Sequence, residues 1–334
     1  MYIQSATLPP KPGCRQFAVD LGTAKTAVYA KDVGIVLREP SVIAVDRQSN
    51  PQRVVAVGNG ALNPALGAAA LAHPLRHGAI SEFNLTVDML KFFLRQSGMR
   101  SSMVRRGEVL IAVPSGTTEV ERRAVFGAAM GAGAKTVLTI EQPMAAAIGA
   151  GLAVSEAAGC MVVDIGAGIS EAAVISRGEV ITSQSIFTAG DSFDNAIITY
   201  VKKKHGLLIG KNTAEDMKIQ IGSAFPCQDE AAMNIQGRDL MSGLPRSADI
   251  TAGEIRQAFA VPLDQILEAI GAAREKTPPE YTAGIARDGI TLTGGGALLR
   301  GLDALIAQEN GIPARVAKDA PDCVVNGAGQ CLQR

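Results

Sequence analysis

The stretch Phe17-Ala-Val-Asp20-Leu-Gly22-Thr23 occurs a second time, in altered form, as Met161-Val-Val-Asp164-Ile-Gly166-Ala167. In each copy an apolar run ends at an Asp, and two residues later a Gly opens a turn of small residues. A second β-rich run follows each turn, at residues 26–30 and 171–176. Each copy therefore predicts a β-hairpin whose tip other groups can approach closely, because Gly has no Cβ.

The chemistry of these tips indicates a phosphate ligand. Backbone N–H groups in a glycine turn can point at an anion, and Asp20 and Asp164 are suited to a hydrated Mg²⁺ ion. Either Asp alone is also an ordinary strand-end turn residue. Two such hairpins at a domain-sized separation, with a third glycine run at Gly294–Gly296, predict two related half-domains that close on one nucleotide.

Composition narrows the class of protein. The chain has 334 residues, 47% hydrophobic and 19% charged, which is enough for two folded domains with their own cores. A formal net charge of zero gives no indication of a nucleic-acid partner. Five cysteines without a Cys-x-x-Cys pair, and a start unlike a signal peptide, favour a cytoplasmic protein with reduced thiols. The three histidines are not spaced as metal ligands, which argues against zinc or Ser-His-Asp chemistry.

The predicted elements alternate between strands and helices in both halves. A capping box, Thr118 with Glu121, starts a helix; Pro143 suits the first turn of another, and Thr213 with Asp216 is expected to cap a third. Pro262 should kink or divide a long helix over 252–276. Strands are expected at 17–20, 27–30, 34–38, 41–46, 54–57, 109–113, 136–140, 160–164, 171–176, 180–185 and 289–292, and helices at 87–96, 143–149, 192–204 and, as the last clear one, 297–309. This order predicts a mixed sheet flanked by helices in each half.

An ordered set of motifs carries a resemblance that runs nearly end to end, from about residue 15 to residue 329. The set resembles MreB, the bacterial actin of the actin/Hsp70/sugar-kinase superfamily. Its members are Asp20-Leu-Gly-Thr-Ala, Glu141-Gln-Pro-Met-Ala-Ala-Ala-Ile-Gly-Ala-Gly, Val163-Asp164-Ile-Gly, Ala189-Gly190-Asp191, Thr213-Ala-Glu-Asp-Met-Lys218-Ile, Gly237-Arg-Asp-Leu and Leu292-Thr-Gly-Gly-Gly-Ala-Leu-Leu.

The resemblance implies an α/β actin-like ATPase fold. Two related lobes are each split into a large and a small subdomain, with the nucleotide in the central cleft. The expected large subdomains are IA, at residues 1–36, 77–150 and 321–334, and IIA, at residues 151–187 and 252–320. The expected small ones are IB, at 37–76, and IIB, at 188–251. ATP and Mg²⁺ are the implied cofactors. The implied partners are further copies of the chain in paired protofilaments, the inner membrane surface and morphogenetic membrane proteins that guide cell-wall synthesis.

The resemblance also assigns roles to individual residues. Asp20 and Asp164 would hold Mg²⁺ through water, and Gln142, Glu141 and Asp164 would serve hydrolysis. Glu215 and Lys218 would flank the nucleoside, although they could also form a simple surface ion pair. The full set expected to bind the nucleotide is Asp20, Gly22, Thr23, Ala24, Lys25, Gly166, Ala167, Gly168, Ile169, Gly190, Asp191, Glu215, Asp216, Met217, Lys218, Gly294, Gly295, Gly296, Ala297 and Leu298.

Three residues at the expected catalytic and phosphate-binding positions differ from the family pattern. Gln142 replaces the second Glu of Glu-Glu-Pro; Gln cannot act as a general base but can orient a water. Ile169 replaces a Thr of the second phosphate loop and removes a hydroxyl. Lys25 replaces an Asn of the first loop and either meets phosphate charge or is a solvated surface lysine. We therefore expect ATP binding with slow or impaired hydrolysis.

A loop between a helix and a strand bears on membrane binding. Met99, Met103 and Val104 lie among arginines, and apolar tips with basic flanks suit shallow insertion into an anionic leaflet. The equivalent loop inserts into the membrane in MreB proteins. The alternative is that the loop packs its methionines on its own domain.

Four functions fit a fold of this kind. We favour a nucleotide-gated cytoskeletal filament, which grows through open-ended heterologous contacts. A small-molecule kinase would need a carboxylate base that Gln142 does not offer, and an Hsp70-like chaperone would need a further peptide-binding domain for which we expect no room before Arg334. The runner-up is a nucleotide-binding scaffold that has lost turnover and forms a specialised filament or copolymer.

Overall fold

The computed structural model describes residues 3–5, 16–46, 49, 53–67, 69–98, 107–226 and 231–333. The elements of the first lobe are β1 (Ile3–Ser5), β2 (Gln16–Leu21), β3 (Lys25–Ala30), β4 (Gly34–Pro40), β5 (Ile43–Asp46), β6 (Arg53–Val57), β7 (Ala70–Ala72), β8 (Leu75–Arg76), β9 (Ala79–Ile80), α1 (Phe83–Gln96), β10 (Glu108–Val113), α3 (Glu119–Ala132), β11 (Thr136–Glu141), α4 (Gln142–Gly149) and, from the far end of the chain, α10 (Cys323–Cys331).

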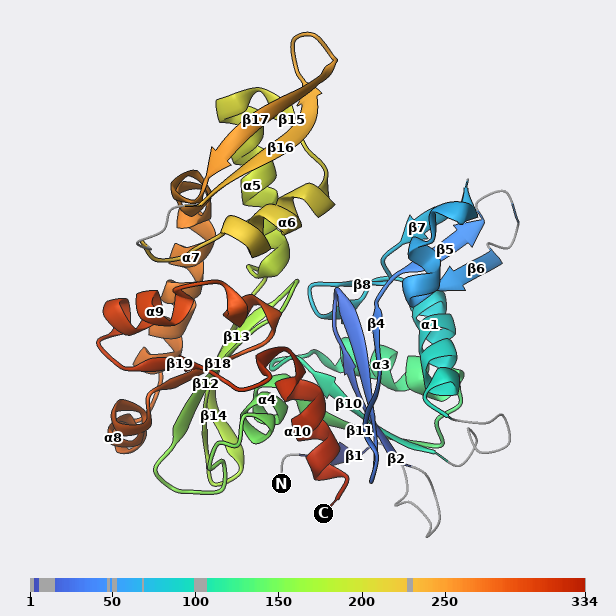
Figure 1. Ribbon diagram of the computed structural model, residues 1–334. Coiled ribbons are helices and arrows are strands. Elements are labelled where there is room, and N and C mark those ends of the chain that lie inside the picture. Colours follow the sequence, from blue (N-terminus) through green and yellow to red (C-terminus); the bar gives the residue numbers. More distant parts are fainter. Residues whose placement is uncertain are drawn as a thin grey trace.

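The second lobe is built from the remaining part of the chain (Figure 1). Its elements are β12 (Cys160–Ile165), β13 (Ser170–Ser176), β14 (Glu179–Ile186), α5 (Gly190–His205), β15 (Leu207–Leu208), α6 (Lys211–Ile221), β16 (Ala232–Asp239), β17 (Pro245–Thr251), α7 (Ala252–Glu275), α8 (Pro279–Asp288), β18 (Ile290–Thr293), α9 (Leu302–Asn310) and β19 (Ala314–Val316).

The main sheets of the two lobes share one topology. The first has the order β1-β11-β10-β2-β3-β4 and the second β19-β18-β12-β13-β14. In each, an antiparallel hairpin (β2–β3 or β12–β13) is extended on one side by a further antiparallel strand and on the other by two parallel strands. The predicted duplication is therefore a duplication of sheet order, and it puts Asp20 and Asp164 at equivalent places.

The central strands of both sheets are buried on both faces. Every residue of β10, β12 and β13 is buried, as expected of strands covered by helices on each side. Each lobe has its own apolar core, and a third apolar cluster joins α4 and α10 with residues from both sheets. In Figure 1, α4 and α10 lie between the two sheets.

Glycines let α4 and α10 approach closely. A Cβ on Gly149 would lie 1.9 Å from the Cys323 carbonyl oxygen, and one on Gly327 would lie 1.8 Å from that of Ala145. No side chain fits at either place, so the backbones of these helices are in direct contact.

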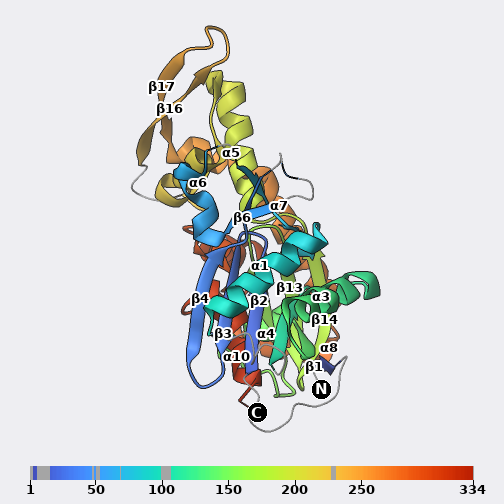
Figure 2. The same ribbon diagram turned by 90° about the vertical axis from the view of Figure 1, so that its right-hand side faces the viewer.

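Smaller sheets lie at the outer end of each lobe. The first lobe carries β6-β5-β7 and the second carries β15-β16-β17. The side view shows that the β16–β17 hairpin extends beyond the rest of the second lobe (Figure 2).

Several predicted helix starts are confirmed. Thr118 and Glu121 form the expected capping box of α3, and Pro143 lies in the first turn of α4. Thr251 and Glu254 make the same box at the start of α7. These caps satisfy backbone N–H groups that have no partner within the helix.

Other predictions of secondary structure were wrong. The helix α6 begins at Lys211 after Gly210, so Thr213 and Asp216 lie inside it and form no cap. The expected division at Pro262 does not occur, because α7 runs without a break from Ala252 to Glu275; the expected kink there stays a prediction. The helix α9 is not the last one, because α10 follows it.

Candidate functional site

The first glycine turn joins β2 to β3. A Cβ on Gly22 would lie 2.5 Å from the Lys25 carbonyl oxygen, so the turn is too tight for a side chain there. The Ser41 hydroxyl donates to the Gly22 carbonyl oxygen (2.7 Å), and the hydroxyls of Ser41 and Thr26 are 2.8 Å apart. These bonds fix the base of the turn, while Ala24 and Lys25 are exposed at its tip.

The second glycine turn joins β12 to β13 and rests on the start of α5. Gly166 N–H donates to the Ile169 carbonyl oxygen (3.0 Å), which closes the turn. The first N–H groups of α5, those of Gly190 and Asp191, donate to the carbonyl oxygens of Gly166 (3.1 Å) and Ala167 (2.8 Å). The turn and the helix terminus are therefore one hydrogen-bonded unit.

The two turns touch each other across the lobes. A Cβ on Gly168 would lie 2.7 Å from Thr23 Oγ1 and 3.1 Å from the His77 backbone nitrogen. Thr23 Oγ1 accepts a hydrogen bond from Gly78 N–H (3.0 Å), and His77 Nδ1 lies 3.2 Å from the Gly168 carbonyl oxygen. The fold thus brings together the two turns that the sequence repeats.

The strand-end aspartates Asp20 and Asp164 are close enough to repel each other. Burial, then repulsion by Asp164 and Asp322, raises the pKa of Asp20 from 3.8 to about 7. Burial raises the pKa of Asp164 to about 6, although the Thr293 hydroxyl donates to its Oδ1 (2.7 Å) and lowers that pKa. A divalent cation between them would offset both effects, so this pair of carboxylates fits a hydrated Mg²⁺ ion.

Direct metal ligation has no support elsewhere in the described part of the chain. Among residues that the structure describes, no group of three or more His, Cys, Asp or Glu side chains is arranged to hold a metal ion. An ion at Asp20 and Asp164 would therefore take most of its ligands from water or from a bound ligand.

Gln142 is buried at the start of α4. Its side chain is 6% exposed, and within the described ranges its Oε1 atom has no hydrogen-bond partner. The preceding Glu141 accepts a hydrogen bond from the Ser115 hydroxyl (3.1 Å). A buried amide oxygen without a partner is costly, so this position fits a group that meets a water or ligand.

The residues predicted to flank a nucleoside do not form the simple ion pair considered from the sequence. Lys218 Nζ pairs with Asp194 Oδ1 (2.7 Å) and donates to the Gly190 carbonyl oxygen (3.3 Å), so it ties α6 to α5, on whose start the second turn rests. Glu215 and Asp216 are exposed. Met217 is fully buried in the core of the second lobe, and only its backbone can face a ligand.

The third glycine run lies against the second hairpin. A Cβ on Gly294 would lie 2.3 Å from the Ile165 carbonyl oxygen, and one on Gly296 would lie 2.4 Å from Ile165 Cγ2. Gly295 has open space beside it. The following Ala297 is a core residue, whereas Leu298 is 59% exposed.

Sequence reasoning missed several groups at this site. Glu171 lies beside Asp164 on β13 and is fully buried. Asp322, which adds to the repulsion on Asp20, pairs with Arg38 through two hydrogen bonds of 2.9 and 2.7 Å. The signal for Glu171 was available, because a Glu within the apolar run 171–175 is unusual in a buried strand. Asp322 gave none, since it lies 302 positions after Asp20 (322 − 20).

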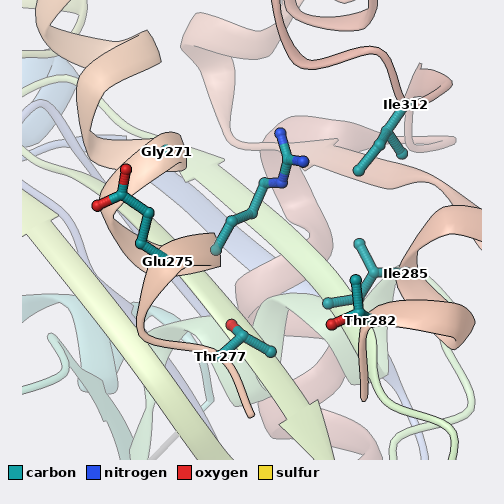
Figure 3. Close-up of a pocket in the computed structure, with 7 residues that line it drawn as sticks. Gly271, Glu275, Thr277, Thr282, Ile285 and Ile312 are labelled. Atoms are coloured by element: carbon teal, nitrogen blue, oxygen red, sulfur yellow. The ribbon is translucent and has the colours of Figure 1, made fainter. Parts of the chain in front are cut away.

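A separate cavity of about 310 Å³ lies between α7, α8 and the chain that leads to β19. Figure 3 shows Ile285 and Ile312 on one side of it and Glu275 on the other. None of the predicted nucleotide residues lines it, so it is a different place from the glycine turns.

The membrane prediction falls on Met99, Met103 and Val104, which lie outside the described residues. Among the described helices, none combines the length and apolar character needed to span a bilayer.

Solved structures with a similar fold define the structural class of this chain. The architecture matches MreB 5 of Spiroplasma citri bound to AMPPNP with a TM-score of 0.91 at 35% identity, covering 97% of both chains, and its ADP-bound structure at 0.90. It also matches a MamK double helical filament with a TM-score of 0.80 over 96% of this chain and 99% of that one, at 20% identity. The chain therefore has the two-lobed α/β fold of actin-like proteins.

The particular family follows from the sequence. A family profile described as MreB/Mbl protein matches residues 14–334. The cell shape-determining protein MreB of Escherichia coli (strain K12) is 48% identical over 321 residues, which cover 95% of this chain and 92% of that protein. The chain belongs to the MreB/Mbl family.

Proposed function

We propose that this chain binds ATP with Mg²⁺ between its lobes and polymerises into membrane-associated filaments that organise cell shape and cell-wall synthesis. The observation that carries the proposal is the contact of the two glycine turns beside Asp20 and Asp164. The similar structures of Spiroplasma citri MreB 5, which are bound to AMPPNP and to ADP, support it.

In this proposal both glycine turns contribute to the binding of a triphosphate. Backbone N–H groups at Thr23–Lys25 and Ala167–Ile169 face the phosphates, and the exposed Lys25 adds positive charge. Asp20 and Asp164 orient the waters around Mg²⁺, which neutralises phosphate charge when bound. The exposed side of Gly295 and Leu298, with Glu215 and Lys218, receives the nucleoside.

Hydrolysis is slow in this proposal. Gln142 orients the attacking water through its unpartnered Oε1 atom, but an amide does not remove the proton as a carboxylate would. A Cβ on Gly78 would lie 2.9 Å from Pro114 Cγ and 3.4 Å from Ile169 Cγ2, so Ile169 packs among first-lobe residues. It offers no hydroxyl there.

Restoring these groups tests the proposed cause of slow turnover. Gln142→Glu with Ile169→Thr should raise the rate of phosphate release from ATP by about tenfold or more, because a general base is worth at least that much. The single variants separate the two contributions. An unchanged rate in the double variant, with ATP binding intact, would remove Gln142 and Ile169 as the cause.

A projecting apolar tip supports self-association. At the turn between β16 and β17, Met241 is 95% exposed, Leu244 66% and Leu240 45%. The MamK relative is described as a double helical filament. We therefore assign this tip to a contact with a second copy of the chain, in an open-ended heterologous interface.

Electron microscopy with a matched pair of variants tests that contact. Met241→Ser with Leu244→Ser should abolish filaments that the wild type forms with Mg²⁺-ATP. Val261→Ser, at an equally exposed apolar residue on α7 (66%), is the control and should still polymerise. Filaments of normal number in the tip variant would exclude this surface.

Membrane association is assigned to the loop that contains Met99, Met103 and Val104. Basic side chains near an anionic leaflet each contribute about 1 kcal/mol, and the apolar tips insert. The Met103→Ser, Val104→Ser variant should lose co-sedimentation with anionic liposomes. Sedimentation equal to that of the wild type would remove the membrane assignment.

The lobes are further assigned to four subdomains with the boundaries implied by the resemblance. The separate small sheets β6-β5-β7 and β15-β16-β17 support subdomains IB and IIB, and the two main sheets support IA and IIA.

Calorimetry and microscopy together test the main proposal. Titration with Mg²⁺-ATP and Mg²⁺-ADP should give heat, and filaments should form only with bound nucleotide. Absence of heat would overturn it. Binding and filaments without any phosphate release would favour the second function instead, a scaffold without turnover, which the hydroxyl-free Ile169 contact supports.

A further inference from the structure

Glu171 is a buried acid that the proposed binding of ATP does not use. In the sheet of the second lobe its register partners are Asp164 on β12 and Ser185 on β14. Its side chain is 0% exposed. A carboxylate so deep in a strand needs strong partners to remain there.

Those partners come from both lobes. Glu171 Oε1 accepts a hydrogen bond from the Ser185 hydroxyl (2.8 Å) in its own lobe. The same oxygen accepts one from the Ser115 backbone N–H (2.8 Å), which lies between β10 and α3 in the first lobe. The bond to Ser115 therefore joins the strand after the second glycine turn to the opposite lobe.

Ser115 continues the connection toward the start of α4. Its hydroxyl donates to Glu141 Oε2 (3.1 Å), and Glu141 is the residue before Gln142. Both Ser115 and Gln142 are buried, at 7% and 6% exposure. The chain of contacts runs from Glu171 through Ser115 and Glu141 to the backbone that carries Gln142.

We propose that Glu171 is a positioning residue: through Ser115 and Glu141 it fixes the Gln142 segment of the first lobe against the second glycine turn. The inference rests on the proposed ATP hydrolysis for its kinetic readout only. Glu171 touches neither nucleotide nor attacking water, and it acts by setting where Gln142 lies.

The pKa of Glu171 is consistent with a buried side chain that keeps its hydrogen bonds to Ser115 and Ser185. Burial, opposed by the bonds from Ser185 and Ser115 and reinforced by nearby Asp164 and Glu141, raises the pKa of Glu171 from 4.5 to about 8. A neutral amide at this position keeps one carbonyl oxygen for both donors without burying a charge. Glu171→Gln is therefore the variant that preserves the link, and Glu171→Ala is the one that removes it.

Kinetics of four variants test the link. Glu171→Ala should lower kcat for phosphate release by about tenfold or more, since small misplacements of a catalytic group cost that much, while KM for ATP and the ADP affinity stay within about threefold. Ser115→Ala, which removes only the Glu141 bond, should lower kcat by about threefold to tenfold. Glu171→Gln should restore most of the wild-type kcat. Ser185→Ala, the matched control within one lobe, should change kcat by less than about twofold.

Hydrogen exchange gives a readout that does not depend on turnover. In the nucleotide-free protein, amide exchange at Ser115, Glu141 and Gln142 should be faster in Glu171→Ala than in wild type, Glu171→Gln or Ser185→Ala. This comparison decides the inference even if the wild type binds no ATP, an outcome that would overturn the proposed function alone. If Glu171→Ala does not fold, Ser115→Ala against Ser185→Ala decides.

Two results would overturn the inference. One is unchanged exchange at Ser115 in Glu171→Ala. The other is an equal effect of Ser185→Ala and Ser115→Ala on kcat, because the step from Ser115 to Glu141 would then matter no more than a bond within one lobe.

Discussion

The two hairpins have the same topology but surround their aspartates differently. Asp20 has Ala27 on one neighbouring strand and Ala112 on the other. The same register positions around Asp164 hold Glu171 and Thr293. The two sheets thus share one geometry, while only the second has polar residues at these register positions.

The two glycine turns also differ, in how far their residues are exposed to solvent. Ala24 and Lys25 in the first turn are exposed, whereas Gly168 and Ile169 in the second are buried against the first lobe. The second turn is fixed by its neighbours, and the first remains open toward solvent. We infer that equivalent substitutions in the two hairpins have unequal effects on stability.

The largest expected effect is on the way the free energy of unfolding depends on pH. Asp20, with pKa about 7, and Asp164, with pKa about 6, both titrate near 3.8 when unfolded. The native state therefore holds more protons in this window, and the free energy of unfolding falls as pH rises from about 4 to about 7. Because one pKa unit is about 1.4 kcal/mol and solvent screens the half-buried Asp20, we expect a fall of about 5 kcal/mol.

Urea unfolding of the nucleotide-free protein across this range measures the effect. Asp20→Asn should end the fall at a lower pH than Asp164→Asn does, since Asp20 has the higher pKa. A free energy of unfolding that rises with pH, or equal curves for both variants, would break the comparison.

Next in size is the loss of Mg²⁺-dependent nucleotide affinity. Asp20→Asn and Asp164→Asn should each weaken Mg²⁺-ATP binding by about 30-fold, because groups that orient metal-bound water contribute 10- to 100-fold. Here the hairpins should behave alike. Titrations in excess EDTA are the control and should show little difference from wild type. A loss confined to one variant would mean that only one aspartate meets the ion.

A smaller effect is expected where the turns touch. Gly168→Ala places a Cβ against Thr23 Oγ1 and the His77 backbone, which must separate the tips. ATP affinity should fall by about tenfold, as overpacking of this kind costs 1–3 kcal/mol. Gly271→Ala, on α7 with open space beside it, is the matched control. Equal calorimetric affinities for the two variants would argue against a rigid contact.

The smallest effect belongs to the open turn. Lys25 is exposed, so its attraction for phosphate is screened, and Lys25→Ala should weaken ATP binding by about threefold at low salt. The difference should vanish at high salt. An effect that persists there would mean that Lys25 is held against the ligand.

Local signals in the sequence were sufficient for most of the fold. The repeated Asp and Gly positions predicted both hairpins, and the Thr118–Glu121 capping box predicted the start of α3. These features depend on residues within a few positions of one another. Family membership, indicated by the ordered motifs, is confirmed by the comparisons.

What the sequence did not reveal depends on distant contacts. The helix α10 contains Gly327 and Gly329, which disfavour a helix in isolation, and it forms because α4 accepts its backbone closely. The partner of Glu171 is Ser115, which lies 56 positions earlier. The nucleotide roles of the individual residues remain predictions, although Met217 and Ala297 are core side chains.

The return of α10 to the first lobe has a consequence for synthesis on the ribosome. This helix packs on β2, β3 and α4, which are made about 170 residues or more earlier. The first half of a nascent chain therefore exposes the apolar surface around Ala145 and Tyr29 until the second half has been translated. Chaperone protection should be needed throughout that interval, and a truncated product lacking α10 should aggregate.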